Sequence, residues 1–503
     1  PGSEGLNLRP PKFSTALYLI VTIKKKYSYW RMKGVNGPTP FLVIGNFGPL
    51  FFFKESLDVF TKRIYEEHPN EKVVGLFKGF SPVLLIRDPG LVKQMLISDA
   101  EYFLNRGTKT GETGLNNSLF SLEGDSWRFL RKKLTPLFTL KKLKSILPSI
   151  QRSTDNFVKH VESTVDSAKD ADIKSLMAKY TADVIMSCLF GFQTDIFNGD
   201  TEKLEEIGAQ IFAPSVLTWL WYRVETVIPG IHKLFGGINP TFKAKSFFFK
   251  LVHHAARNRE SKELNNMNFL DLMIDLKQSN DAAEYDDDKP LKVTDELIGT
   301  ETYTFYGAGY HSSALTMAFL AHELAFHQNI QDRLHKEILA VTNKHDGELN
   351  IDTLKEMTYL QMVLFETLRK NTTIGWLIRN TENDYTVPGM NLTIQKGTSI
   401  LISTGGIHSD PKYFHNPEQF DPENFSPENK KNIPHYLFSP FGVGPRNCIG
   451  VRFAEIQMMM AIAAFFMRFK VEPCEKTERR LRYDAKSISL NTPSGIWLKI
   501  SRR

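Results

Sequence analysis

A glycine-broken loop at residues 441–450, FGVGPRNCIG, delivers one cysteine, Cys448, to the start of an apolar run. Its glycines Gly442, Gly444 and Gly450 permit backbone angles and close approaches that a side chain would forbid, so a flat ligand can lie against the loop. The thiolate form of cysteine ligates metals, and N–H groups at the start of a helix stabilise its charge. The pattern therefore predicts that Cys448 holds a metal in a flat macrocycle.

Two other interpretations compete for this loop. A lone cysteine in a turn is more often a buried, inert side chain than a ligand, and only the residues around Cys448 reverse that preference. A dinucleotide-binding G-x-G-x-x-G turn is excluded, because Asn447 occupies the third glycine position and Pro445 follows the second glycine.

The loop resembles the haem-binding loop of the cytochrome P-450 family, whose pattern is Phe, two residues, Gly, one residue, Arg, one residue, Cys, one residue, Gly. The chain matches each fixed position with Phe441, Gly444, Arg446, Cys448 and Gly450. The resemblance implies haem b bound by these residues and Gly442, with Cys448 as the iron ligand. A thiolate ligand pushes electron density onto the iron and favours O–O cleavage. The resemblance covers nearly the whole chain and is strongest to microsomal insect members that metabolise xenobiotics.

Composition favours one large domain that contains an apolar pocket. The chain has 503 residues without a Gly/Ser-rich or Pro-rich linker, and 42% hydrophobic residues with 37 phenylalanines can fill a large core. The net charge of +7 is mild and too dispersed to indicate nucleic-acid binding, but it suits an acidic protein partner or an anionic membrane surface. Three cysteines without a C-x-x-C pair argue against a disulfide framework and a zinc ribbon.

The N-terminal segment has a short apolar stretch, residues 16–21, flanked by Lys12 and by lysines at 24–26. A membrane-spanning helix needs about 20 apolar residues, so this stretch is too short to cross a bilayer. The sequence GPTP at residues 37–40 resembles the proline hinge that follows the signal anchor in microsomal family members. We expect residues 1–33 to be a truncated membrane anchor and residues 34–503 to form the catalytic domain.

Hydrophobic periodicity predicts a mostly helical chain. Apolar residues recur at spacings of three and four over Gln151–His160, Thr294–His327 and Ile330–Thr342. β-branched residues between turn signals predict short strands at Val73–Leu76, Val83–Ile86, Leu392–Ile394, Ser399–Ser403 and Ile496–Ile500. The expected fold class is mainly α with small β-sheets (α+β). The resemblance implies the cytochrome P-450 fold, a single large helical domain with a minor β-rich part.

Trp127 and Arg131 lie one helical turn apart and can reach the same anion. Without further context they are equally an aromatic ring packed beneath a surface arginine. They resemble the family's Trp-x-x-x-Arg element, which contacts the haem propionates, and the resemblance adds Arg379 and Arg446 as further partners. Burial of propionates requires such cations.

Glu366 and Arg369 are three residues apart in a helical pattern and so share one helix face. Alone, such a pair is most often a surface ion pair. Its flanking residues resemble the family's Glu-x-x-Arg helix, which supports the core behind the haem. Asn424 occupies the place of the arginine that usually completes this group, so hydrogen bonding is kept but the charge and the planar fork are lost.

Small residues in the long helix let it pass close to a ligand, and Ala308-Gly309 resembles the distal element of the family. There an acid and a threonine follow, whereas this chain has His311 and Ser312. Proton delivery needs a hydroxyl and a titratable group behind it, and histidine can relay protons near neutral pH. Ala308, Gly309, His311 and Ser312 are therefore the candidate catalytic residues. The exchange of acid for histidine also allows chemistry that needs no external dioxygen.

The substrate pocket is expected beneath residues 211–249, where aromatic residues stand among basic ones. The resemblance implies a helix pair and loop that roof the pocket and dip into a membrane, while ordinary core packing accounts equally well for any single residue there. The residues expected to line the pocket are Phe305, Thr373, Ile374, Trp376, Asn491 and Thr492, with Trp376 narrowing it.

The resemblance implies a haem-thiolate monooxygenase that inserts one oxygen atom from O2 into a lipophilic small molecule. Electrons would come from NADPH through a cytochrome P-450 reductase, with cytochrome b5 as a second partner, at the cytoplasmic face of the endoplasmic reticulum membrane, the microsomal fraction. Two alternatives stay open. His311 favours a haem-thiolate dehydratase, lyase or isomerase, and His311, Asn424 and the poor anchor together motivate a haem-binding paralogue without turnover.

Overall fold

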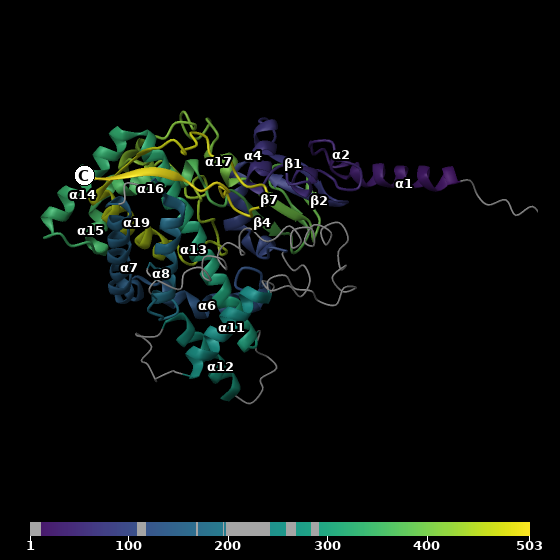
Figure 1. Cartoon of the computed structure of the whole chain (residues 1–503). Helices are drawn as coiled ribbons and strands as arrows, with labels where there is room; N and C mark the ends of the chain where they lie inside the picture. Colours follow the sequence, from purple (N-terminus) through teal and green to yellow (C-terminus); the bar gives the residue numbers. More distant parts are fainter. Residues whose placement is uncertain are drawn as a thin grey trace, which may run out of the picture.

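The computed structural model describes residues 12–107, 117–166, 170–194, 196–197, 242–257, 268–282 and 291–503. Helices dominate these ranges and form one large body, with the sheet that contains β1, β2, β4 and β7 to one side (Figure 1). The α-helices are α1 (Lys12–Tyr27), α2 (Tyr29–Met32), α3 (Gly48–Phe51), α4 (Leu57–Glu67), α5 (Pro89–Lys93), α6 (Gly124–Leu134), α7 (Leu140–Asp166), α8 (Ile173–Cys188), α11 (Phe242–Arg257), α12 (Phe269–Ala282), α13 (Asp295–Phe326), α14 (Gln328–Lys344), α15 (Ile351–Glu356), α16 (Thr358–Lys370), α17 (Thr404–His408), α18 (Pro427–Lys430) and α19 (Val451–Arg468). Shorter helical turns are η1 (Gln94–Ser98), η2 (Ala100–Phe103), η3 (Thr135–Phe138) and η6 (Pro422–Phe425).

Helix α13 is the central element of the helical body. The Thr294 hydroxyl caps it by accepting a hydrogen bond from the Leu297 N–H, and apolar residues surround the helix on nearly all sides, as expected for a helix buried in a core. Helices α8 and α11 pack along it. The predicted helices over Thr294–His327 and Ile330–Thr342 are confirmed as α13 and α14.

Helix α7 contains the predicted segment Gln151–His160 but begins earlier, at Leu140, because it accommodates Pro148 in its interior. Proline removes one backbone hydrogen bond and is read from sequence as a helix boundary. Packing against α8 and α19 compensates for this local cost.

Three small sheets complete the part of the fold that the structure describes. The largest has the strand order β1 (Val73–Lys78), β2 (Ser81–Ile86), β7 (Ser399–Ile402), β4 (Leu377–Asn380), and β2 pairs in parallel with β7. The others are β3 (Ala171–Asp172), β9 (Trp497–Arg502) and β8 (Phe469–Pro473) in one sheet, and β5 (Tyr385–Thr386) with β6 (Thr393–Ile394). The five predicted strands are present with shifts at their ends, whereas β3, β4, β5 and β8 were not predicted. Strand β4 matters most here, because it carries Arg379 into the interior.

Helix α1 projects from the body beside the sheet that contains β1 and β2 (Figure 1). None of the helices within the described ranges is both long enough and apolar enough to cross a bilayer. The predicted roof of the pocket, residues 211–249, falls largely outside the described residues. Of its described part, Phe248 is buried in the core against Tyr303 and Tyr306 of α13.

Candidate active site

The loop at residues 441–450 has a conformation that requires glycine. Gly442 and Gly444 have φ angles of 73° and 76°, in the left-handed region. A Cβ atom on Gly444 would lie 1.9 Å from the carbonyl oxygen of Leu96, so the loop packs backbone to backbone against η1. The Cys448 N–H donates to the Phe441 carbonyl at 2.9 Å, which closes the loop on itself directly before α19. The backbone therefore fixes the position of Cys448.

The Cys448 side chain has accessible surface even though protein surrounds it. Burial raises the pKa of its thiol, while the Gly450 N–H and the guanidinium groups of Arg131 and Arg106 act in the opposite direction. Because protein surrounds the Cys448 thiol, its accessible surface faces a space inside the molecule and not the outer solvent. Cys448 thus faces an internal space lined by cations that favour the thiolate.

Four arginines converge beside this thiol: Arg106 interacts with Arg131, Arg379 and Arg446, and Arg106 and Arg131 act on Cys448 itself. Burial lowers the pKa of Arg379 to about 10 and that of Arg446 to about 9, and burial together with the other three arginines lowers the pKa of Arg106. Arg446 also lies over the ring of Trp127, with its guanidinium carbon 4.1 Å from the ring centroid. The elements that bring these side chains together are residues 104–107, α6, β4 and the cysteine loop.

These cations have few anionic partners of their own. Within the described residues, every hydrogen bond from the four guanidinium groups goes to a backbone carbonyl or to the amide oxygen of Asn447. Arg446, for example, donates to the carbonyls of Leu104, Leu119 and Leu122. Buried like charges repel and lose hydration, so the group is stabilised by an anion of more than one charge.

Helix α13 presents a narrow accessible stripe toward the interior. Between Leu297 and Ala325, Ala308 is the exposed residue, Thr304, Gly309 and Ser312 are partly exposed, and all the others are buried. Thr304, Ala308 and Ser312 recur every four residues and therefore share one helix face. Phe138 joins this helix to the cysteine loop, because its ring stacks on Phe305 at 6.0 Å and lies 3.7 Å from a Cβ built on Gly450.

The two polar residues of the predicted distal motif make different contacts. The Ser312 hydroxyl donates to the Ala308 carbonyl at 2.7 Å. The Nε2 atom of His311 is 2.9 Å from the Ser489 hydroxyl, in the segment that also contains Asn491 and Thr492. Burial, with a smaller contribution from Lys174, lowers the pKa of His311 to about 3, so its imidazole is uncharged at neutral pH.

The family model described as Cytochrome P450 matches residues 35–499. The chain belongs to the cytochrome P450 family. Cytochrome P450 6B7 of Helicoverpa armigera is 35% identical over 490 residues, which cover 97% of this chain and 96% of that protein. Cytochrome P450 6B1 of Papilio polyxenes is 37% identical over 485 residues, with 95% and 96% covered. A probable cytochrome P450 6a14 of Drosophila melanogaster is 34% identical over 496 residues, with 95% and 96% covered.

This cytochrome P450 is a monooxygenase whose family binds haem b through a cysteine thiolate. The residues present fit that group. A thiol with accessible surface inside the protein suits the iron ligand, and the converging arginines suit the two propionates. Trp127 packs beneath Arg446 and leaves Arg131 to bond the Asn447 side chain and carbonyl.

Glu366 and Arg369 of α16 form an ion pair that links this helix of the cytochrome P450 to the segment 408–419. Both side chains are fully buried, with Arg369 Nε and Nη2 donating to Glu366 Oε2 and Oε1 at 2.8 and 2.7 Å. The remaining guanidinium donors reach the carbonyls of His408, Pro417 and Gln419. Asn424 donates to Glu366 at a longer 3.3 Å, so it is a minor member of the network.

The residues predicted to line the pocket lie in two segments that meet. The Leu490 N–H donates to the Thr373 carbonyl at 2.9 Å, which places residues 372–376 beside residues 487–492. Ile374 is 39% exposed, whereas Thr373, Asn491 and Thr492 are buried. Phe305 is also buried, between Phe138 and Phe269. Trp376 is partly exposed with its indole nitrogen near Asp58 of α4.

Arg106 is the residue of this site that the sequence did not reveal. It stands alone between Asn105 and Gly107, with no spacing or motif that relates it to Cys448. Its role depends on the tertiary approach of residues 104–107 to the cysteine loop, where Arg106 Nη2 donates to the Arg446 carbonyl at 3.2 Å.

We expect Glu366→Ala to destabilise the protein by about 3–5 kcal/mol, because it leaves the Arg369 guanidinium buried without its anion. Asn424→Ala should cost about 1 kcal/mol, because Glu366 keeps both bonds to Arg369. Denaturant unfolding of the haem-loaded variants measures both values. Equal losses for the two variants would contradict the unequal shares assigned to Arg369 and Asn424.

Proposed function

We propose that this cytochrome P450 inserts one oxygen atom from O2 into a lipophilic small molecule, with Cys448 as the iron ligand. The proposal depends mainly on two accessible surfaces. One is on Cys448, and the other is on the stripe of α13 that contains Ala308. The haem, when bound, supplies the reduction of O2 and the oxidising power. Apolar side chains such as Ile374 and Phe120, 39% and 43% exposed, supply the surface that a lipophilic substrate would cover.

The protein's own residues would hold the cofactor and manage protons. Arg106, Arg131, Arg379 and Arg446 would neutralise the propionates, which removes the repulsion among these cations. The Ser312 hydroxyl, donating to the Ala308 carbonyl, keeps its lone pairs available to accept a proton donor above the accessible stripe. His311 is uncharged and linked to Ser489, so it can pass a proton by exchanging tautomers rather than by storing charge.

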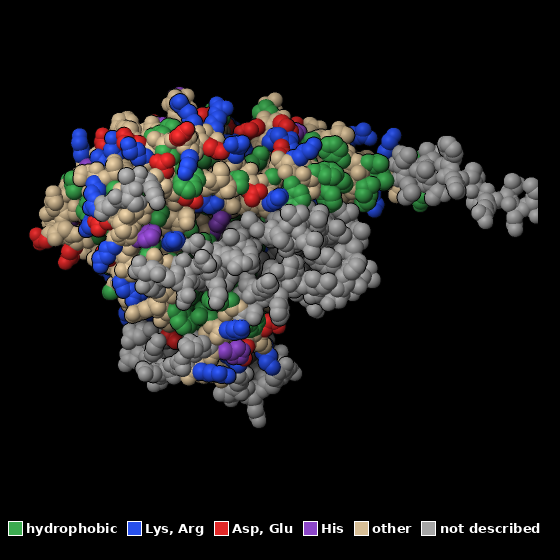
Figure 2. Space-filling view, in the orientation of Figure 1, with side chains coloured by type: hydrophobic (Ala, Val, Ile, Leu, Met, Phe, Trp, Pro, Cys, Tyr) green, Lys and Arg blue, Asp and Glu red, His purple; other side chains and the backbone are tan. Residues whose placement is uncertain are grey.

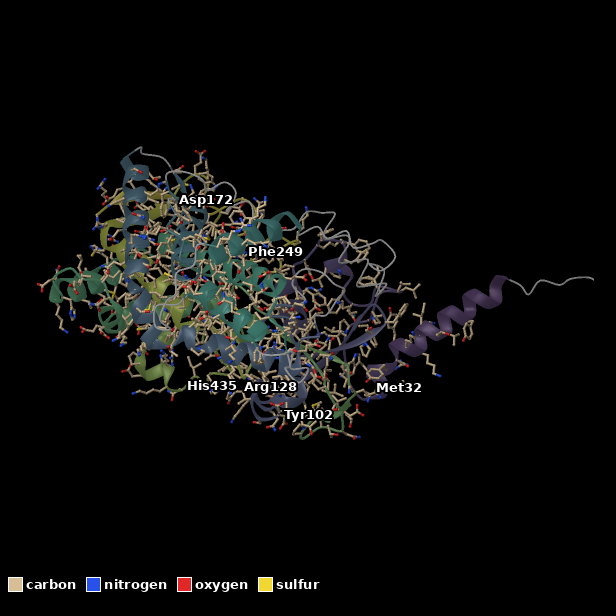
Figure 3. All side chains as sticks on the ribbon, turned by 90° about the horizontal axis from the view of Figure 1, so that it is seen from below. Met32, Tyr102, Arg128, Asp172, Phe249 and His435 are labelled. Atoms are coloured by element: carbon tan, nitrogen blue, oxygen red, sulfur yellow. The ribbon has the colours of Figure 1, made fainter. Side chains whose placement is uncertain are left out.

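Electrons would arrive from an NADPH-dependent cytochrome P450 reductase, with cytochrome b5 as a second donor. Helix α6, which contacts the cysteine loop through Arg131, exposes Lys132 and Lys133 beside it. Arg128 of the same helix, labelled in Figure 3, forms ion pairs with Glu101 and Asp125, so the positive charge without an ion pair in the described part of the chain comes here from the lysines. Exposed positive charge next to the thiol complements an acidic protein partner and speeds its encounter.

The same proposal places residues 34–503 as the catalytic domain on the cytoplasmic face of the endoplasmic reticulum membrane, with residues 1–33 as part of an anchor. Large exposed hydrophobic side chains gather beside α1, at Phe41, Leu42, Val43, Phe52 and Phe80, which we call the N-terminal patch (Figure 2). Tyr27 at the end of α1 stacks on Phe80 at 5.8 Å. Apolar side chains beside lysines 24–26 suit an anionic lipid interface.

With purified reductase and NADPH, the haem-loaded protein should convert members of a panel of lipophilic compounds to products that carry one atom of 18O from 18O2. The reduced, carbon-monoxide-bound protein should show the thiolate-shifted Soret band, and Cys448→Ser should lose it. Product formed without reductase and NADPH would instead establish a lyase, dehydratase or isomerase. No product under either condition, with an intact Soret band, would leave a haem-binding protein without turnover.

Replacing His311 with phenylalanine should lower the product formed per NADPH consumed by at least about tenfold, because a proton-transfer group is lost while an aromatic ring is kept. Ser489→Ala should give a smaller loss, since it removes one hydrogen-bond partner of the imidazole and keeps the imidazole itself. Peroxide release and product are measured together. The control is His322→Phe, which removes another buried histidine of α13, bonded to the Glu478 carbonyl. If His311→Phe forms as much product per NADPH consumed as the wild-type protein, His311 has a structural role and does not transfer protons.

Charge placed in the N-terminal patch should weaken membrane binding. We expect Phe41→Glu with Leu42→Glu to reduce partitioning onto vesicles of phosphatidylcholine and phosphatidylserine by about tenfold or more, because two exposed apolar side chains are lost. Sedimentation with vesicles measures the bound fraction. Leu140→Glu changes an exposed leucine at the start of α7, away from α1, and should bind normally. Equal loss in both proteins would exclude the N-terminal patch as the contact.

A further inference from the structure

Asp58 is a buried acid in the first turn of α4, a helix that packs against α17. One carboxyl oxygen, Oδ1, accepts a hydrogen bond from the Gly375 N–H at 2.5 Å. The other oxygen, Oδ2, is buried and lacks a hydrogen-bond partner among the residues that the structure describes. A buried carboxyl oxygen without a partner is costly, so a donor is expected within its reach.

The indole of Trp376 is that donor. Its Nε1 atom is also buried and has no hydrogen-bond partner in the described part of the chain, although Trp376 as a whole is partly exposed. The indole N–H acts on the Asp58 carboxyl and lowers its pKa, so the two groups are neighbours. A donor and an acceptor that lie together inside the protein form a hydrogen bond after a small turn of the ring.

The buried charge of Asp58 makes these donors necessary. Burial raises the pKa of the carboxyl to about 7, and the interactions that lower it come from the N–H groups of Gly375, Asp58 itself and Trp376. No cation of the described residues contributes. An asparagine would accept from Gly375 equally well, but its side-chain nitrogen cannot accept from an indole. A carboxyl group has one acceptor for each donor, which accounts for an acid at this position.

Gly375 transmits the contact to the pocket wall. A Cβ atom on Gly375 would lie 3.2 Å from Asp58 Oδ1 and 3.3 Å from the Gly405 Cα, and the Gly405 N–H donates to the Gly375 carbonyl at 2.9 Å. The Gly375 peptide is therefore held between α4 and α17 with little room to shift. Its two neighbours, Ile374 and Trp376, are the accessible residues of the segment 372–376. Asp58 thus acts from behind the surface that this segment presents to a ligand.

We infer that Asp58 is a positioning residue that fixes one wall of the substrate pocket, by accepting the Gly375 N–H with one carboxyl oxygen and the Trp376 indole N–H with the other. This inference rests on the proposed function and adds to it a selectivity for flat, narrow substrates. An indole bonded to Asp58 does not yield to a wide ligand, whereas a released ring can turn aside. Asp58 itself touches no ligand and acts through Trp376.

The test measures how well the haem-loaded protein distinguishes two ligands of different width, butylbenzene and 1-butyl-3,5-dimethylbenzene. Binding is followed by the shift of the Soret band to shorter wavelength, which requires no turnover. Wild-type protein should bind butylbenzene about tenfold more tightly than the wider ligand. Asp58→Asn keeps the Gly375 bond and Trp376→Phe keeps an aromatic ring, and each should reduce this preference to about twofold or less. The double variant should show no further loss, because both changes break the same bond.

The matched control is Glu337→Gln. Glu337 of α14 is another partly buried carboxyl that accepts two N–H groups of a neighbouring helix, those of Tyr359 and Leu360 of α16. This variant should keep the full preference for butylbenzene, because it changes a carboxyl of the same kind outside the segment 372–376.

A second measurement observes the hydrogen bond itself, in protein labelled with 15N-tryptophan and studied in the diamagnetic, reduced and carbon-monoxide-bound form. The chain has six tryptophans, and Trp376→Phe identifies the Trp376 indole by the resonance that it removes. Asp58→Asn should move that indole proton upfield, because a charge-assisted hydrogen bond is lost. Glu337→Gln should leave it in place.

The inference is overturned by equal affinities in wild-type protein, by a preference that survives in Asp58→Asn, by additive losses in the double variant, or by an indole resonance that Asp58→Asn does not shift. If Asp58→Asn fails to load haem, Trp376→Phe decides, since a preference kept in that protein also overturns the inference. A failure of the proposed function looks different, because both ligands would bind with the expected preference and NADPH-dependent product would be absent.

Discussion

The part of the structure around the cysteine loop depends on the buried ion pair between Glu366 and Arg369. One guanidinium joins α16 to His408 at the end of α17 and to the carbonyls at 417 and 419. These segments precede the cysteine loop along the chain, and the Ser439 N–H donates to His408 Nε2 at 3.0 Å. The buried ion pair therefore fixes the segments that lead into the cysteine loop, and through them the position of Cys448.

The opposite, distal side of the site, formed by α13, is organised by close packing around that helix rather than by charge. Ala308 and Gly309 allow the interior space to reach the α13 backbone, and Gly309 is so tightly backed that an added Cβ would meet Ile185 at 2.3 Å. Ser312 bonds a carbonyl of its own helix, whereas His311 bonds Ser489 and Ser313 bonds Gln457 in other elements. The distal side of the site thus combines accessible surface, small side chains and an uncharged histidine.

The sequence predicts those features of the site that depend on local spacing. The cysteine loop follows from glycines at fixed positions, and Glu366 and Arg369 follow from one helical turn. Arg106 and Ser489 could not be found this way, because their partners Arg446 and His311 are 340 and 178 residues distant along the chain.

The convergence of four arginines has a consequence for how the cell makes this protein. Before haem arrives, Arg106, Arg131, Arg379 and Arg446 repel one another in a desolvated space. A dianionic cofactor that binds only the folded chain stabilises it in proportion to the logarithm of its free concentration. The stability of the folded enzyme then depends on the haem supply, so a shortage of haem lowers the fraction of chains that are folded.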